Sequence, residues 1–127
     1  MSLQIGKAIY SILSGDTAVK SYVGKKIYPI FAPDETLAPF IVYERKNLSA
    51  TYTKDGLIYD DCSVIVNIVS DNYTECINIA SAVRSILELK VGQYNGINII
   101  NILLSSAAED YGIDGFITTL EFAIRSR

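Results

Sequence analysis

A chain of 127 residues with eleven basic and fourteen acidic side chains has the size of one ordinary domain and a net charge of −3. That charge argues against nucleic acid as the main partner, because binding to phosphates requires a net positive face. No apolar run approaches the roughly eighteen residues of a membrane span, and the amino terminus lacks the basic-then-apolar pattern of a secretory signal. We therefore expect a single domain over residues 1–127 that contacts neither membranes nor nucleic acid directly.

The chain begins with a pattern typical of two helices. Apolar residues at spacings of three and four predict a helix over residues 2–13, with Ile5, Ile9 and Leu13 on one face. Gly15 fits the end of this helix, and Asp16 fits the cap of a second, shorter one. The apolar face of the second helix holds Ala18, Val19, Tyr22 and Val23.

Strand patterns occupy the next part of the chain. Residues 27–30 predict a short strand, and Pro29 within it lacks an amide donor, which favours the edge of a sheet. Residues 40–54 and 57–70 predict a long antiparallel hairpin, because Asp55-Gly56 between them is a strong two-residue turn signal.

The two ends of this hairpin differ in composition. Toward its base, one face of the second strand is wholly apolar, with Cys62, Val64, Val66 and Ile68. Residues 47–59 are instead rich in Thr, Ser and Tyr and show little apolar alternation. We therefore expect the distal part of the hairpin to project into solvent or onto a neighbouring molecule.

The strongest pattern predicts a central helix over residues 73–90. Asn72 and Glu75 before and within its first turn resemble a capping box. The polar residues of this segment form one narrow stripe, so we expect the helix to be buried over most of its circumference. The apolar residues away from that stripe are Cys76, Ile77, Ile79, Ala80, Val83, Ile86 and Leu87.

Two further strands end the chain, over residues 97–109 and 116–124, with turns at Asn95-Gly96 and at residues 112–115. Adjacent strands joined by tight turns are antiparallel. The sequence therefore predicts an α+β fold with a mainly antiparallel sheet and a long hairpin. An N-terminal helix and one central helix cover one face of this sheet.

The residue types that carry catalysis are scarce. Histidine, the commonest general base and metal ligand, is absent. Cys62 and Cys76 lie in apolar stretches and predict buried, inert thiols. Asp60 and Asp61 are neighbours on a strand and point to opposite faces, so they cannot share a proton. We expect no enzymatic activity, no cofactor and no metal site.

Several runs of the sequence resemble the small phage tail-completion, or tail-terminator, proteins. They are ILSGDTAV at residues 12–19, VGKKIYP at 23–29, APFIVY at 38–43, VIVNIVS at 64–70 and ASAVRSIL at 80–87. The likeness covers nearly the whole chain in order and length. It does not extend to residues 47–59 or 91–106.

The resemblance implies a structural role in a phage or prophage. Proteins of this kind form a ring, typically of six, on the head-proximal end of the tail tube, where they stop tube growth and join the tail to the head. The implied partners are other copies of the chain, the tail-tube protein and the head connector protein. The implied location is the virion tail, and the host cytoplasm during assembly.

Tyrosines on the predicted hairpin suggest where such contacts lie, because tyrosine is enriched at protein interfaces. Its high β propensity is an equally good explanation. The residues that we expect to contact another subunit or the tube are Arg45, Thr51, Tyr52, Lys54, Asp55, Leu57 and Tyr59.

Two other functions remain open at this point. One is a different virion part of similar size, such as a head-closure or minor tail protein. The other is a small ligand-binding or regulatory α+β domain, which a buried pocket with converging polar groups would support.

Overall fold

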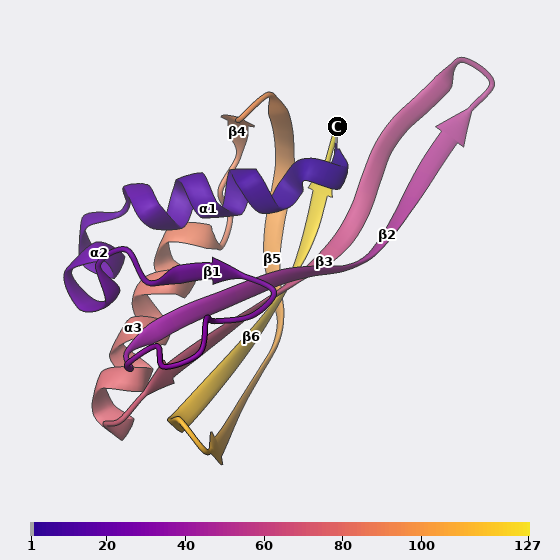
Figure 1. The fold of residues 1–127 in the computed structure, drawn as a ribbon. Coiled ribbons are helices and arrows are strands. Elements are labelled where there is room, and N and C mark those ends of the chain that lie inside the picture. The colour runs from indigo at the N-terminus through magenta and orange to yellow at the C-terminus, as the bar shows by residue number, and fades with distance from the viewer. Residues whose placement is uncertain (1) are drawn as a thin grey trace.

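The computed structural model describes residues 2–127 and confirms the α+β class with a mainly antiparallel sheet. A short 3₁₀ turn precedes the first helix, and the C-terminus lies beside it (Figure 1), where the Ser126 hydroxyl donates to Ser2 Oγ at 2.9 Å. The elements in chain order are α1 (Ile5–Gly15), α2 (Thr17–Val23), β1 (Ile27–Pro29), β2 (Phe40–Thr53), β3 (Gly56–Ser70), α3 (Tyr73–Leu87), β4 (Gly92–Tyr94), β5 (Ile97–Gly112) and β6 (Gly115–Ser126).

The six strands form one twisted sheet in the order β1-β2-β3-β6-β5-β4. All neighbours run antiparallel except β1, which pairs in parallel with β2 at the predicted edge. The sheet also contains β4, which the sequence analysis did not predict. This strand is only three residues long and pairs with the start of β5, so it carries almost no periodic signal.

The helices pack against one face of the sheet and enclose the core (Figure 1). The alternating face predicted for β3 is buried here, together with the corresponding residues of β2, β5 and β6. The residues that meet in this core include Ile5, Ile9 and Leu13 of α1, Ile79 and Val83 of α3, Val64 and Val66 of β3, and Phe122 of β6. Burying each of these side chains stabilises the fold by roughly 1.5–3 kcal/mol.

Three details differ from the sequence-based expectations. The β2–β3 turn lies at Lys54-Asp55, one residue earlier than predicted, because Thr53 already pairs with Gly56. In α2, Val19 and Val23 are buried, whereas Ala18 and Tyr22 are exposed, since seven residues form too short a helix to bury a wide face. The central helix ends at Leu87 instead of residue 90 and is not buried over most of its circumference, because only one of its faces packs on the sheet and Ile77 is 37% exposed.

The junction between β3 and α3 extends the predicted cap. The Asn72 side chain accepts a hydrogen bond from the Glu75 amide at 3.0 Å, as a capping residue does. Glu75 does not reach back to the Asn72 amide directly. Instead the Ser70 hydroxyl accepts from that amide at 3.2 Å and donates to Glu75 Oε1 at 2.7 Å. The buried Ser70 thus relays the second bond of the capping box.

Gly115, at the start of β6, lies directly against this junction. Its φ of +122° is one that L side chains rarely adopt, and an added Cβ would lie 2.6 Å from the Ser70 carbonyl oxygen. No side chain fits there unless the junction moves.

We predict that Gly115→Ala lowers the free energy of unfolding by about 1–3 kcal/mol, through backbone strain and the clash with Ser70. Urea denaturation followed by circular dichroism measures the change. Gly15→Ala is the matched control: nothing lies within 4 Å of its added Cβ, so the substitution leaves stability unchanged or raises it slightly. Equal stability of Gly115→Ala and the wild type would contradict the proposed clash.

Candidate assembly surfaces

The distal part of β2 and β3 projects beyond the helices (Figure 1). Pairing between β3 and β6 ends at Asp60–Ser126, so before Asp60 the strand β3 pairs with β2 alone. We call residues 47–59 the β2–β3 tip. It is a two-stranded ribbon whose register shifts between Thr51 and Tyr52, and at its base Leu48 packs against the core. A ribbon of this kind has little stability of its own unless something else supports it.

An aromatic and ionic contact supports the base of the tip. Arg125 of β6 donates from Nε and Nη2 to the two carboxylate oxygens of Asp61, at 2.9 and 3.2 Å. The same guanidinium lies over the Tyr59 ring, 3.8 Å from its centroid. The hydrogen bond to Asp61 raises the pKa of Arg125 above its usual value. This group fixes where the ribbon leaves the sheet.

The residues expected at an interface fall into two groups. Tyr52 is 70% exposed, and Lys54 and Asp55 form the exposed turn, so these three are free to contact a partner. Thr51, which pairs with Tyr59, is half-buried.

The second group is tied to the base of the tip. The Tyr59 ring is occupied by Arg125, and Arg45 is half-buried with its Nη1 donating to the Lys46 carbonyl at 3.1 Å. The Leu57 backbone pairs with Tyr52, and the Leu57 side chain lies outside the described part of the structure. The sequence pattern gave no signal for the Arg125 contact, because its partners are more than sixty positions away in the chain.

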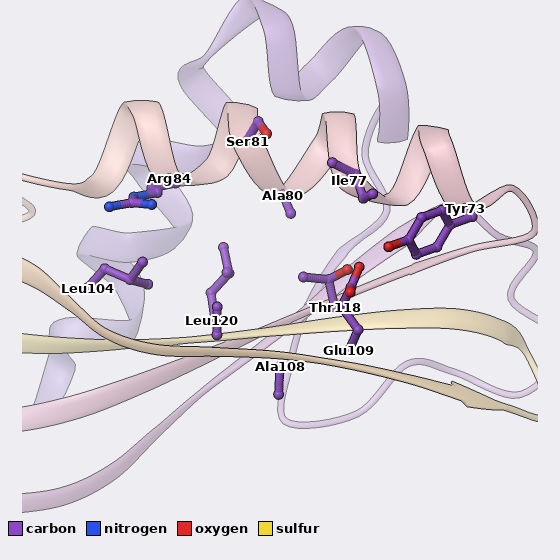
Figure 2. Close-up of a pocket in the computed structure, with 11 residues that line it drawn as sticks. Tyr73, Ile77, Ala80, Ser81, Arg84, Leu104, Ala108, Glu109, Thr118 and Leu120 are labelled. Atoms are coloured by element: carbon purple, nitrogen blue, oxygen red, sulfur yellow. The ribbon is translucent and has the colours of Figure 1, made fainter.

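A surface groove that the sequence analysis missed lies between α3 and strands β5 and β6 (Figure 2). Its volume is about 470 Å³. The α3 wall carries Tyr73, Ile77, Ala80, Ser81 and Arg84, and the sheet wall carries Leu104, Ala107, Ala108, Glu109, Thr118 and Leu120. Most of these side chains are half-exposed or exposed, so the groove is an open trough and not an enclosed pocket.

Charged side chains flank this apolar trough. Near the start of α3 the Glu109 carboxylate raises the pKa of the Tyr73 phenol, by a side-chain hydrogen bond first and by its charge second. Near the end of α3, Arg84 forms an ion pair with Glu88, and that hydrogen bond lowers the pKa of Glu88. The exposed Ile77 noted above lies between these two ends (Figure 2). The groove therefore offers an apolar strip between an acidic and a basic side chain.

The described residues contain no arrangement typical of a metal centre or a membrane span. No cluster of three or more His, Cys, Asp or Glu side chains occurs among residues 2–127. In the same range no helix has the length and apolar character that crossing a bilayer requires. Both cysteines are buried free thiols.

Comparison with known proteins identifies a family and a solved structure to which the chain is similar. The family described as tail completion protein gp17 matches residues 7–126. A solved structure described as the virion of a native gene transfer agent particle is similar with a TM-score of 0.77, at 15% identity over 94% of this chain and 90% of that one. At this identity the structural likeness establishes the fold alone. No curated protein matches the chain.

We predict that neither thiol reacts readily in the folded protein. Burial raises the pKa of Cys62 from 9.0 to about 11, with Arg45 opposing and Asp60 and Asp61 adding to the shift. At pH 8 only about one Cys62 in a thousand is then a thiolate. Alkylation by iodoacetamide, followed by mass spectrometry, should be slow in buffer and fast in urea.

The raised pKa also has a consequence for stability. The folded state holds the Cys62 proton more tightly than the unfolded chain, so stability is intact below pH 9 and falls as the pH rises toward about 11. Rapid native alkylation of Cys62 at pH 8 would contradict both statements.

Proposed function

The chain belongs to the tail completion protein gp17 family, a family of structural phage tail proteins, and on that premise we propose that it caps the head-proximal end of the tail tube. In this role several copies form a ring that ends tube growth and joins the tail to the head. The observation that carries the proposal is the family match, which spans nearly the whole chain from residue 7 to residue 126.

The shape of the protein suits a ring built from identical contacts. A closed ring needs head-to-tail contacts, in which one surface of a subunit meets a different surface of the next. The projecting tip, with Tyr52, Lys54 and Asp55 exposed, is one such surface. The groove beside α3 is a second and different one. Six copies of the 14.0 kDa chain would form a ring of about 84 kDa.

The proposal assigns partners and a location to the protein. One rim of the ring contacts the tail-tube protein and the other contacts the head connector protein. The protein then belongs to the virion tail, after synthesis in the host cytoplasm. We assign it no catalytic step, because the family to which it belongs is one of structural tail proteins.

Deleting the gene from the source phage or prophage tests the role. We expect electron microscopy to find separate heads and tails, with tubes of irregular or excessive length, because nothing ends their growth. Complementation with the wild-type gene should restore joined particles of normal length. Tails of normal length that fail to join filled heads would assign the protein to head closure, and intact infectious virions would refute a tail role altogether.

We propose that Arg45, Thr51, Tyr52, Lys54, Asp55, Leu57 and Tyr59 contact another subunit or the tube, and shortening the tip tests the five of them that lie within residues 51–57. We replace residues 51–57 by Asn-Gly, which leaves a four-residue loop between the paired Ala50 and Asp60. Because these residues lie outside the core, thermal unfolding should change little, whereas complementation of the deletion should fail.

Lys20→Gln on the exposed side of α2 is the control and should complement fully. If the shortened chain also completes tails, the tip is not an assembly surface.

A further inference from the structure

The sheet has an unpaired edge on each of its two outer long strands. On one side β1 pairs only with Ile41–Tyr43 of β2, so no strand of the described chain pairs with the outer edge of residues 44–53. On the other side β4 pairs only with Ile97–Ile99 of β5, and the Leu89 amide donates to the Ile102 carbonyl at 2.8 Å. Beyond that point no described strand pairs with the outer edge of residues 103–112. The two open stretches are ten residues each.

The charges of the two stretches, Glu44 to Lys46 and Glu109-Asp110, lie toward one end of each, and the remainder lacks the usual protection against edge-to-edge pairing. Natural proteins place charges, prolines or covering segments on exposed strand edges to prevent such contacts. Here residues 103–108 read Leu-Leu-Ser-Ser-Ala-Ala and residues 47–53 read Asn-Leu-Ser-Ala-Thr-Tyr-Thr, with no charge or proline in either. Each edge therefore presents free amide and carbonyl groups to a strand from outside.

We propose that the open edge of β2 in one copy pairs with the open edge of β5 in the next copy, so that the ring closes through one continuous sheet. The inference rests on the proposed ring and names its contact. Each subunit then pairs its β2 edge with one neighbour and its β5 edge with the other, as head-to-tail closure requires.

Strand directions favour this pairing. Three antiparallel steps separate β2 from β5, through β3 and β6, so β2 and β5 run in opposite directions within one subunit. When the strands run along the ring axis, a neighbour related by rotation about that axis keeps their direction. Its β5 therefore meets the first subunit's β2 as an antiparallel strand, the more stable of the two sheet pairings.

The short edge strands do not obstruct this contact. We align residues 44–53 of one copy antiparallel with residues 103–112 of the next. In this alignment β1, which pairs with Ile41–Tyr43, lies beyond Gly112, the last residue of the neighbour's β5. At the other end β4 lies beyond the Lys54-Asp55 turn, where β2 has ended. β1 and β4 thus cover only the parts of β2 and β5 that the neighbouring copy does not reach. Because they block those parts, they restrict how far the two paired strands can slide along each other.

Charge agrees with the same register. It places Lys46, which forms an ion pair with Glu44 on its own strand at 3.0 Å, opposite Asp110 of the neighbour. Opposite charges on facing strands stabilise a sheet by roughly 0.2–1 kcal/mol per pair.

Disulfide cross-linking tests the contact directly. Ser49→Cys on β2 and Ala108→Cys on β5 lie opposite each other once the bulge between Arg45 and Leu48 is counted, and both side chains are exposed on the face of the sheet away from the helices. Purified tails carrying the double variant are oxidised and run on a non-reducing gel. We expect a ladder of covalent oligomers up to the full ring. Each single variant should remain monomeric, and so should a control that combines Ser49→Cys with Thr17→Cys on α2.

Charge reversal tests the register in two ways. It is combined with the added cysteines in the cross-linking assay, and it is measured by complementation in chains that lack them. We expect Lys46→Glu or Asp110→Lys alone to lower the cross-linking yield roughly fivefold, because like charges then face each other. The combined Lys46→Glu/Asp110→Lys variant should recover it. Lys46→Glu with Asp114→Lys, in the β5–β6 turn, is the matched control and should not.

The outcomes separate this inference from the proposed function. Normal tails without a ladder would overturn the edge pairing and leave the capping role standing. If the cysteine variant completes no tails, complementation by the charge variants decides: rescue in the double reversal supports the pairing, and folded double-reversal protein that fails to complement overturns it. Thermal unfolding of each purified variant establishes that it is folded.

Discussion

The structure depends on the burial of α1 and α3 against a single face of the sheet. Ile5, Ile9 and Leu13 of α1 and Ile79 and Val83 of α3 are fully buried there against the alternating residues of β3 and β6. The apolar area that these side chains remove from water is the main favourable contribution to folding. The junction of Ser70, Asn72 and Glu75 fixes where α3 begins, and Gly115 leaves room for that junction. Register and strand order follow from keeping this face apolar.

Covering only one face leaves the remainder of the sheet available for contacts between molecules. The strands are longer than the helices that cover them, so the ends of β2 and β3 extend beyond the core as a ribbon. Arg125, held by Asp61, stacks on Tyr59 at the base of that ribbon. The groove beside α3 exists for a related reason: β4 covers only the start of β5, and the remaining edge and Ile77 stay at the surface. A protein that functions through assembly benefits from such unfinished edges, whereas a monomer would need to protect them.

Much of the fold was readable from local periodicity. The helical spacing of Ile5, Ile9 and Leu13 and the alternation of Cys62, Val64 and Val66 predicted the faces that are buried. Periodicity failed where an element is very short, as in β4, or where no other element covers an apolar residue, as at Ile77. The turn at Lys54-Asp55 differs from the predicted one because Gly56, with φ of +117°, serves as the first residue of β3 instead of a turn residue.

The sequence by itself determined the class of fold, the two main helices and the absence of histidine chemistry, because each follows from composition or from residues close together in the chain. It also marked residues 47–59 as a segment with no apolar reason to join the core. Only the tertiary structure decided which of those residues are free. It placed Arg125 over Tyr59 and Glu109 beside Tyr73. Among the described residues it also left the outer edges of β2 beyond Tyr43 and of β5 beyond Ile102 without a partner strand. These features join residues far apart in the chain, and a local pattern carries no information about which distant strands become neighbours.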